Sequence, residues 1–182
     1  MSGSSQRGSS GDHPLGNQLG DAPDRTIADL PADLFVIHEA EIDPDLARAA
    51  FADLDWLGRP VDALPGGGLR RFATDLELQV RDGSGPAVRK AALVDIGVVR
   101  ETEDGLDVPI AWRSASLAPL FPVFAGHLGI RRTGLTLDGR YAPPFGRFGL
   151  LIDRGLLYVI ATRTAEAFLE RVARQCRGPA TG

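Results

Sequence analysis

The last third of the chain constrains its fold most. There an alternating segment, Leu135–Tyr141, is followed by two prolines and then by a long apolar-rich stretch that reaches Cys176. Alternation of apolar and polar residues is typical of a half-buried β-strand, whereas the later stretch has helical spacing. A sheet that ends in one long helix can enclose an apolar cavity between the two. The sequence therefore predicts an α+β binding fold, without naming what is bound.

The final helix is predicted to begin near Phe145 and to end near Cys176, where Gly178 and Pro179 stop it. At about 1.5 Å per residue it would be roughly 45 Å long, enough to cross a whole sheet. We expect its first half to be wrapped by protein, because it is apolar on more than one face: Phe148, Leu150, Leu151, Ile152, Leu156, Leu157, Val159 and Ile160. In the amphipathic second half, the side chains expected in solvent are Arg163, Glu166, Glu170, Arg171 and Arg174, and those expected to dock are Ala161, Ala165, Phe168 and Val172.

The segments before this helix predict one strand, one or two helices and five antiparallel strands. Asp43 is a suitable helix N-cap, and Pro44 suits the first helical position. In the strand at 108–114, Pro109 limits the first residues to an edge or irregular position, so pairing is expected to begin late there. The predicted elements are a strand at 34–42, a helix at 44–54, a short helical turn at 56–64, and strands at 71–80, 92–98, 108–114, 121–132 and 135–141.

Side chains on one face of each element are expected to form the core. In the first helix they are Leu46, Ala47, Ala50, Phe51 and Leu54. The inward rows of the strands are Phe72, Leu76, Leu78 and Val80, then Ala92, Val94, Ile96 and Val98, then Val108, Ile110, Trp112 and Ser114, and finally Leu135, Leu137, Gly139 and Tyr141.

Composition limits the classes of function. The net charge is −4, and all but one of the twenty basic residues are arginine, so nucleic acid is not the expected partner. Cys176 is the single cysteine, which excludes an internal disulfide framework and fits a reducing cytoplasm. With three scattered histidines there is no zinc-type spacing, and we expect neither a metal nor a cofactor.

Residues 1–28 are rich in Gly and Ser with almost no large apolar side chains, and we expect a disordered tail. The folded domain is predicted to span 29–177, with a disordered C-terminus at 178–182. The tail has no apolar stretch of signal-peptide length. The most apolar segment, 145–161, contains Arg147, Asp153 and Arg154, so stable membrane insertion is not expected.

The order of elements, together with the local sequence at 135–172, resembles the helix-grip family, also called the START-related or SRPBCC superfamily. The similar residues are Leu-Thr-Leu-Asp-Gly-Arg-Tyr-Ala-Pro-Pro-Phe-Gly-Arg-Phe-Gly, then Asp153-Arg154, then Ala165-Glu166-Ala167-Phe168-Leu169. The resemblance implies a curved antiparallel sheet around the C-terminal helix, with an apolar cavity between them. Members include polyketide cyclases and carriers of lipids or coenzyme Q, so the fold alone does not decide function.

An aromatic ring with one polar group suits an apolar ligand that carries a few oxygens, and two such residues, Trp112 and Tyr141, have inward phases. For each candidate pocket residue the alternative is that its side chain simply packs in the hydrophobic core. The predicted ligand-binding set is Trp112, Phe124, Leu128, Tyr141, Phe148, Ile152 and Leu156.

No catalytic residue is assigned. His127 is predicted on the outer face, because Leu128 and Ile130 take the inward positions, whereas His38 has an inward phase. Cys176 has no base to activate it and is predicted to be inert. Asp95 and Arg113 are expected outward, as solvated charges. Asp153 and Arg154 are expected at the cavity mouth or paired with a strand charge such as Arg140, and the alternative is that Arg154 orients an acidic or carbonyl ligand.

Three functions stay open at this point. The leading hypothesis is a cytoplasmic protein that binds a hydrophobic small molecule (a lipid, isoprenoid or polyketide-like compound) in an interior cavity. The second is a polyketide cyclase or aromatase-like enzyme, which would need His38 or Tyr141 as its inward acid or base. The third is an interaction module with a solid core. The sequence predicts neither the identity of the ligand nor the oligomeric state.

Overall fold

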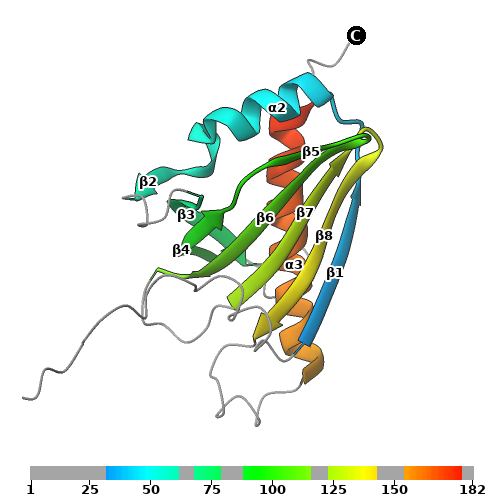
Figure 1. Ribbon diagram of the computed structural model, residues 1–182. Coiled ribbons are helices and arrows are strands. Elements are labelled where there is room, and N and C mark those ends of the chain that lie inside the picture. Colours follow the sequence, from blue (N-terminus) through cyan, green and yellow to red (C-terminus); the bar gives the residue numbers. More distant parts are fainter. Residues whose placement is uncertain (1–31, 62–67, 79–87, 116–122, 143–153, 178–182) are drawn as a thin grey trace, which may run out of the picture.

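The computed structural model describes residues 32–61, 68–78, 88–115, 123–142 and 154–177, with the backbone alone described at 77–78, 88–90 and 154–157 (Figure 1). In chain order the elements are β1 (Ala32–Glu39), α2 (Pro44–Asp53), a 3₁₀ helix (Asp55–Leu57), β2 (Arg59–Val61), β3 (Arg70–Leu78), β4 (Val88–Ile96), β5 (Arg100–Thr102), β6 (Gly105–Ser114), β7 (Val123–Arg131), β8 (Gly134–Ala142) and α3 (Arg154–Cys176).

The strands form one antiparallel sheet in the order β1-β8-β7-β6-β4-β3-β2, with β5 paired to β6. The long helix α3 packs against β1 and β8 near one edge and also against β3 near the other. Figure 1 shows that the sheet curves around α3, which contacts strands near both of its edges. The predicted fold class, a curved antiparallel sheet around a long C-terminal helix, is confirmed.

The inward rows of the sheet follow the predicted alternation. Phe72, Val94 and Ile110 are buried, as are Leu135 and Leu137 in β8. Among the predicted inward residues whose side chains are described, Ser114 and Gly139 are half-buried and Val98 is 62% exposed. Val98 is exposed because β4 ends at Ile96. The side chain of Leu78 and residue Val80 lie outside the described residues. The described core is therefore the concave face of the sheet together with the inner face of α3.

Pro109 lies in the middle of β6 rather than at its start. On one side β6 pairs with β7 from Gly105 onward, so the prediction that pairing begins late is wrong there. On the other side, β5 pairs with 105–107 and β4 with 110–114, which leaves Pro109 between the two ladders. Proline is tolerated because its missing N–H falls in this gap, where its carbonyl accepts from the N–H of Gly97 at 2.8 Å.

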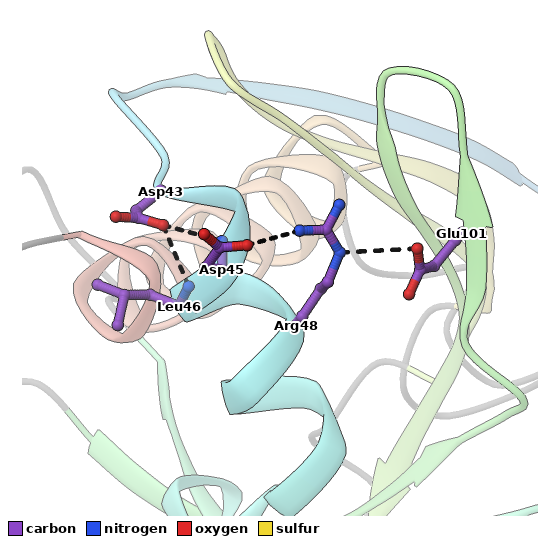
Figure 2. A network of polar contacts seen from close by, with 5 residues as sticks. All are labelled: Asp43, Asp45, Leu46, Arg48 and Glu101. Carbon is purple, nitrogen blue, oxygen red and sulfur yellow. Dashed lines mark hydrogen bonds and ion pairs between the residues drawn. The ribbon is translucent and has the colours of Figure 1, made fainter.

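The helix α2 has the predicted start. Asp43 Oδ1 accepts the backbone N–H groups of Asp45 at 2.8 Å and Leu46 at 3.2 Å, and Pro44 is the first helical residue (Figure 2). The Asp43 N–H donates to the carbonyl of Cys176 at 2.8 Å, which joins the start of α2 to the end of α3. Ala47, Phe51 and Leu54 are buried, but Leu46 is exposed and not part of the core.

Replacing Asp43 with alanine is expected to lower the free energy of unfolding by about 1 kcal/mol, because two N–H groups of α2 lose their acceptor. The matched control is Asp45→Ala, whose carboxylate contacts only the exposed side chain of Arg48 (Figure 2). That variant should cost under about 0.5 kcal/mol. Urea denaturation of both measures the difference, and equal losses would contradict the capping role.

The predicted helical turn at 56–64 is only partly present. The 3₁₀ helix covers Asp55–Leu57, and the chain then becomes the short strand β2, which pairs with β3. The three residues of β2 are too few to show alternation, and all three are exposed. Residues 62–64 lie outside the described residues.

Two further expectations about exposure are wrong. Asp95 is not a solvated charge, because its carboxylate accepts from Arg71 Nε at 2.6 Å and from Nη2 at 2.8 Å, and both side chains are 14% exposed. This hydrogen bond raises the pKa of Arg71 despite its partial burial. In α3, Val159 is 43% exposed rather than wrapped, since the sheet covers one face of the helix only. The end of α3 at Cys176 is confirmed, whereas its predicted first residues, 145–153, lie outside the described residues.

The predicted domain boundaries stay predictions. The tail at 1–28 and the C-terminus at 178–182 lie outside the described residues.

Candidate functional site

Three of the predicted ligand-binding residues lie side by side across the concave face. Trp112 on β6 is paired with Phe124 on β7, and Phe124 is paired with Tyr141 on β8. All three are buried. We call Trp112, Phe124 and Tyr141 the aromatic row. The rings of Trp112 and Phe124 are stacked with centroids 4.3 Å apart, and Phe168 of α3 lies 5.6 Å from Trp112, so the row connects the sheet to the helix.

Two glycines make room for the ring of Phe124. Gly126 and Gly139 face each other on β7 and β8. A Cβ atom at either position would lie 2.8 Å from Phe124 Cζ and 2.6 Å from the Cα of the other glycine. The ring therefore occupies space that any side chain there would fill. Gly139 was expected on the inward face, but its pairing with Gly126 depends on the strand register and is not visible in the sequence.

The aromatic row has a polar group without a partner. Trp112 Nε1 is buried, and its N–H finds no acceptor among the described residues. A buried donor left unsatisfied costs about 1–3 kcal/mol. Burial, followed by the influence of Tyr158, raises the pKa of Tyr141 above its ordinary value, so its phenol stays protonated at neutral pH. The floor of the site thus combines apolar rings with a hydrogen-bond donor in need of an acceptor.

The other predicted ligand-binding residues are not placed in this row. Leu128 is buried on β7, four residues beyond Phe124, which is about 14 Å along a strand. Phe148 and Ile152 lie outside the described residues, as does the side chain of Leu156. Whether any of the seven touches a ligand stays a prediction.

A cleft of about 590 Å³ is lined in part by Phe168, the residue of α3 that contacts Trp112, although Trp112, Phe124 and Tyr141 do not line it. It forms because β2 pairs only with Arg71–Ala73, so that among the described strands nothing pairs with the outer edge of β3 beyond Ala73. Helix α3 makes the opposite wall, and Phe168 belongs both to this wall and to the contact with Trp112. We call this space the arginine cleft, because three arginines line it. Its lining residues are Gly58, Arg59, Ala73, Thr74, Asp75, Leu76, Ala91, Ala167, Phe168, Arg171 and Arg174.

Arg171 belongs to one wall of the arginine cleft. The prediction that its side chain lies in solvent is wrong. Its guanidinium donates to Thr74 Oγ1 at 2.9 Å, and to the carbonyls of Trp56 at 2.6 Å and Leu57 at 3.1 Å. Its Cζ also lies 5.9 Å from the centre of the Trp56 ring. These contacts tie α3 to β3 and to the 3₁₀ helix. No local pattern indicates them, because the partners are about a hundred residues away along the chain.

The histidines and the cysteine contribute little to this site. His127 is exposed on the outer face as predicted, with Nδ1 3.5 Å from a carboxylate oxygen of Asp107. His38 is half-buried, and its Nε2 has no hydrogen-bond partner among the described residues. Burial raises the pKa of the Cys176 thiol to about 11, so it remains protonated and unreactive near neutral pH.

The predicted surface charges are accounted for where they are described. Arg113 is exposed, as expected. Arg140 Nε lies 3.3 Å from Asp33, while Asp153 and the side chain of Arg154 lie outside the described residues. In the described part of the chain, no group of three or more His, Cys, Asp or Glu side chains is arranged to hold a metal ion. No helix in that part has both the length and the apolar character needed to cross a membrane.

No protein-family model matches the sequence, and no curated protein matches it. Solved structures with a similar fold include the following two. TTHA0849 from Thermus thermophilus has a TM-score of 0.46 at 15% identity, over 79% of this chain and 96% of that one. The di-domain ARO/CYC protein StfQ from the steffimycin biosynthetic pathway has a TM-score of 0.42 at 13% identity, over 84% of this chain and 53% of that one, so the chain spans about half of StfQ. By its own strand order and the position of α3, the chain has the helix-grip fold that its sequence resemblance implied.

Proposed function

We propose that this protein binds a hydrophobic small molecule, of lipid, isoprenoid or polyketide-like chemistry, between the concave face of the sheet and α3. The observation that carries the proposal is the buried N–H of Trp112, which has no acceptor among the described residues. An oxygen on an otherwise apolar ligand would satisfy it. The flanking rings of Phe124 and Phe168 supply apolar surface for the rest of the molecule.

The size of the neighbouring space supports the same proposal. Small-molecule sites are usually about 300–1,000 Å³, mostly apolar, with a few placed polar groups. The arginine cleft has about 590 Å³ and shares Phe168 with the aromatic contact. A ligand that enters from the open edge of β3 would reach Trp112 by displacing Phe168, which is buried.

Replacing Trp112 with phenylalanine is expected to weaken binding of Nile red, a neutral carbonyl-containing probe, about tenfold, because the probe loses its donor. The smaller ring leaves a cavity between Phe124 and Phe168, which lowers stability by about 1–2 kcal/mol, and the loss of an unsatisfied donor offsets part of this cost. The matched control is Trp56→Phe, whose Nε1 donates to the Ala50 carbonyl at 2.9 Å. That variant should lose about 1 kcal/mol of stability and keep its probe affinity.

Fluorescence titration and urea denaturation of both variants measure these effects. Unchanged probe affinity in the Trp112 variant, or an equal loss of affinity in the Trp56 variant, would contradict the role of the indole N–H. Native mass spectrometry of the protein purified from its own host identifies any retained compound. A wild-type protein that retains nothing and binds no apolar probe would overturn the proposed function and favour the interaction module.

The enzyme alternative has weaker support. A cyclase needs an acid or base beside the reacting carbonyl, and the inward candidates are His38 and Tyr141. His38 pairs with Leu135 and Tyr141 pairs with Ala32, so the two sit six residues apart along β8. That is about 20 Å along the strand, too far to act together on one carbonyl. Tyr141 alone, with its raised pKa, is a proton donor rather than a base.

A further inference from the structure

We infer that the arginine cleft binds an oxyanion, and that the ligand is an amphiphilic anion whose charged head lies in this cleft and whose apolar body extends toward Trp112. This inference rests on the proposed function and names the class of ligand. The head is a carboxylate or a phosphate, since guanidinium groups pair with both through two parallel N–H···O bonds.

The charge of the cleft differs in sign from that of the protein. Three of its lining residues are arginines, Arg59, Arg171 and Arg174, and one is acidic, Asp75, so the lining carries a formal charge of +2. The whole chain carries −4. Cationic residues gathered in a concave site on an acidic protein focus a positive potential there, and this potential attracts anions.

The three arginines differ in how firmly they are held. Arg171 is fixed by Thr74 and by two main-chain carbonyls, so it shapes the wall. Among the described residues, Arg174 has a single long ion pair, 4.0 Å to Glu170, between side chains that are 63% and 59% exposed. Arg59 is exposed and makes no ion pair with another described residue. Arg59 and Arg174 therefore have guanidinium groups available for an incoming oxyanion.

The apolar side of the cleft leads away from these charges. Leu76 and Phe168 are lining residues that are almost fully buried, and Ala167 lies beside them on α3. Phe168 precedes Arg171 and Arg174 by three and six residues, or about 5 and 9 Å along the helix. Its ring is 5.6 Å from Trp112. A ligand that touches both ends needs an apolar body of roughly 10–15 Å.

The test compares three probes of equal chain length by their displacement of Nile red: dodecanoate, dodecyl phosphate and neutral dodecanol. At low ionic strength the wild-type protein should bind at least one of the two anions ten or more times more tightly than dodecanol. The preference should shrink as salt rises, because exposed guanidinium groups are screened. The preferred anion tells whether the head is a carboxylate or a phosphate.

The variant that tests the site is Arg59→Glu with Arg174→Glu, which should abolish the preference for anions and leave dodecanol affinity within about twofold. The matched control is Arg100→Glu with Arg113→Glu, which changes the net charge equally at two exposed arginines outside the cleft and should keep the preference. A preference lost equally in both double variants would show a general charge effect and overturn the site.

Failure of the inference is distinguishable from failure of the proposed function. Equal affinity of the wild-type protein for dodecanoate, dodecyl phosphate and dodecanol overturns the anion site and leaves hydrophobic binding standing. Inorganic phosphate that competes as well as dodecyl phosphate shows an anion site without an amphiphile, which also overturns the inference. No binding of Nile red or of any dodecyl compound overturns both.

Discussion

Replacing Gly126 with alanine is expected to lower the free energy of unfolding by about 3 kcal/mol, with a fall in melting temperature of roughly 10 °C. The added Cβ would overlap the carbonyl oxygen of Asp138, and would lie 2.6 Å from Gly139 Cα and 2.8 Å from Phe124 Cζ. The first two contacts are with the backbone of β8, which cannot retreat without opening the ladder between β7 and β8. The ring of Phe124 would also be pushed from its stack with Trp112.

The control for this prediction is Gly68→Ala, since a Cβ there would meet only Val98 Cγ2 at an ordinary 3.5 Å. It should change stability by less than about 1 kcal/mol, in either direction. Urea denaturation followed by circular dichroism gives both values, and the near-ultraviolet spectrum reports the packing of Trp112. If Gly126→Ala changed the free energy of unfolding as little as the control, the close contact between Gly126 and Gly139 would be contradicted.

Replacing Arg171 with methionine is expected to cost about 3 kcal/mol of stability. Methionine keeps most of the apolar stem but removes the guanidinium, so the carbonyls of Trp56 and Leu57 and the hydroxyl of Thr74 lose their donor. Hydrogen bonds from a charged donor contribute about 1.5–3 kcal/mol each, and partial access of water reduces the sum. Lysine should recover only part of the loss, because one ammonium cannot reach all three acceptors.

The neighbouring arginine provides the comparison. Arg174→Met removes a guanidinium from the same helix, one turn further on, where it has only the long, exposed contact with Glu170. Its cost should stay below about 0.5 kcal/mol. Thermal and urea denaturation of the two methionine variants separate the roles. Equal losses would mean that Arg171 does not join α3 to the rest of the molecule.

The elements that the sequence predicted well are those whose signal is local. Alternation along β3, β6 and β8 is a property of each segment alone, and it correctly placed Phe72, Trp112 and Tyr141 on the inner face. The Asp43-Pro44 start of α2 is likewise complete within a few residues. Local patterns of this kind predicted an antiparallel sheet followed by a long helix and most of the described core, whereas the curvature of the sheet around the helix was implied by the family resemblance.

Features that depend on pairing between distant segments could not be predicted. The short strand β2 exists through its pairing with Arg71–Ala73, and the burial of Arg171 depends on acceptors in two other elements. The arginine cleft combines residues of β2, β3, β4 and α3, which no motif links in the sequence. For the same reason, the predicted ligand set contained the aromatic row but none of the cleft arginines.

The pairing of β1 with β8 has a consequence for folding. Ala32 faces Tyr141, about 110 residues later in the chain, and α3 packs on strands from both edges of the sheet. Contacts between such distant segments require a large loop to close before they contribute, which slows folding. During synthesis on a ribosome, β1 emerges first and has no partner until β8 follows. We therefore expect β1 to gain protection from hydrogen exchange no earlier than β8.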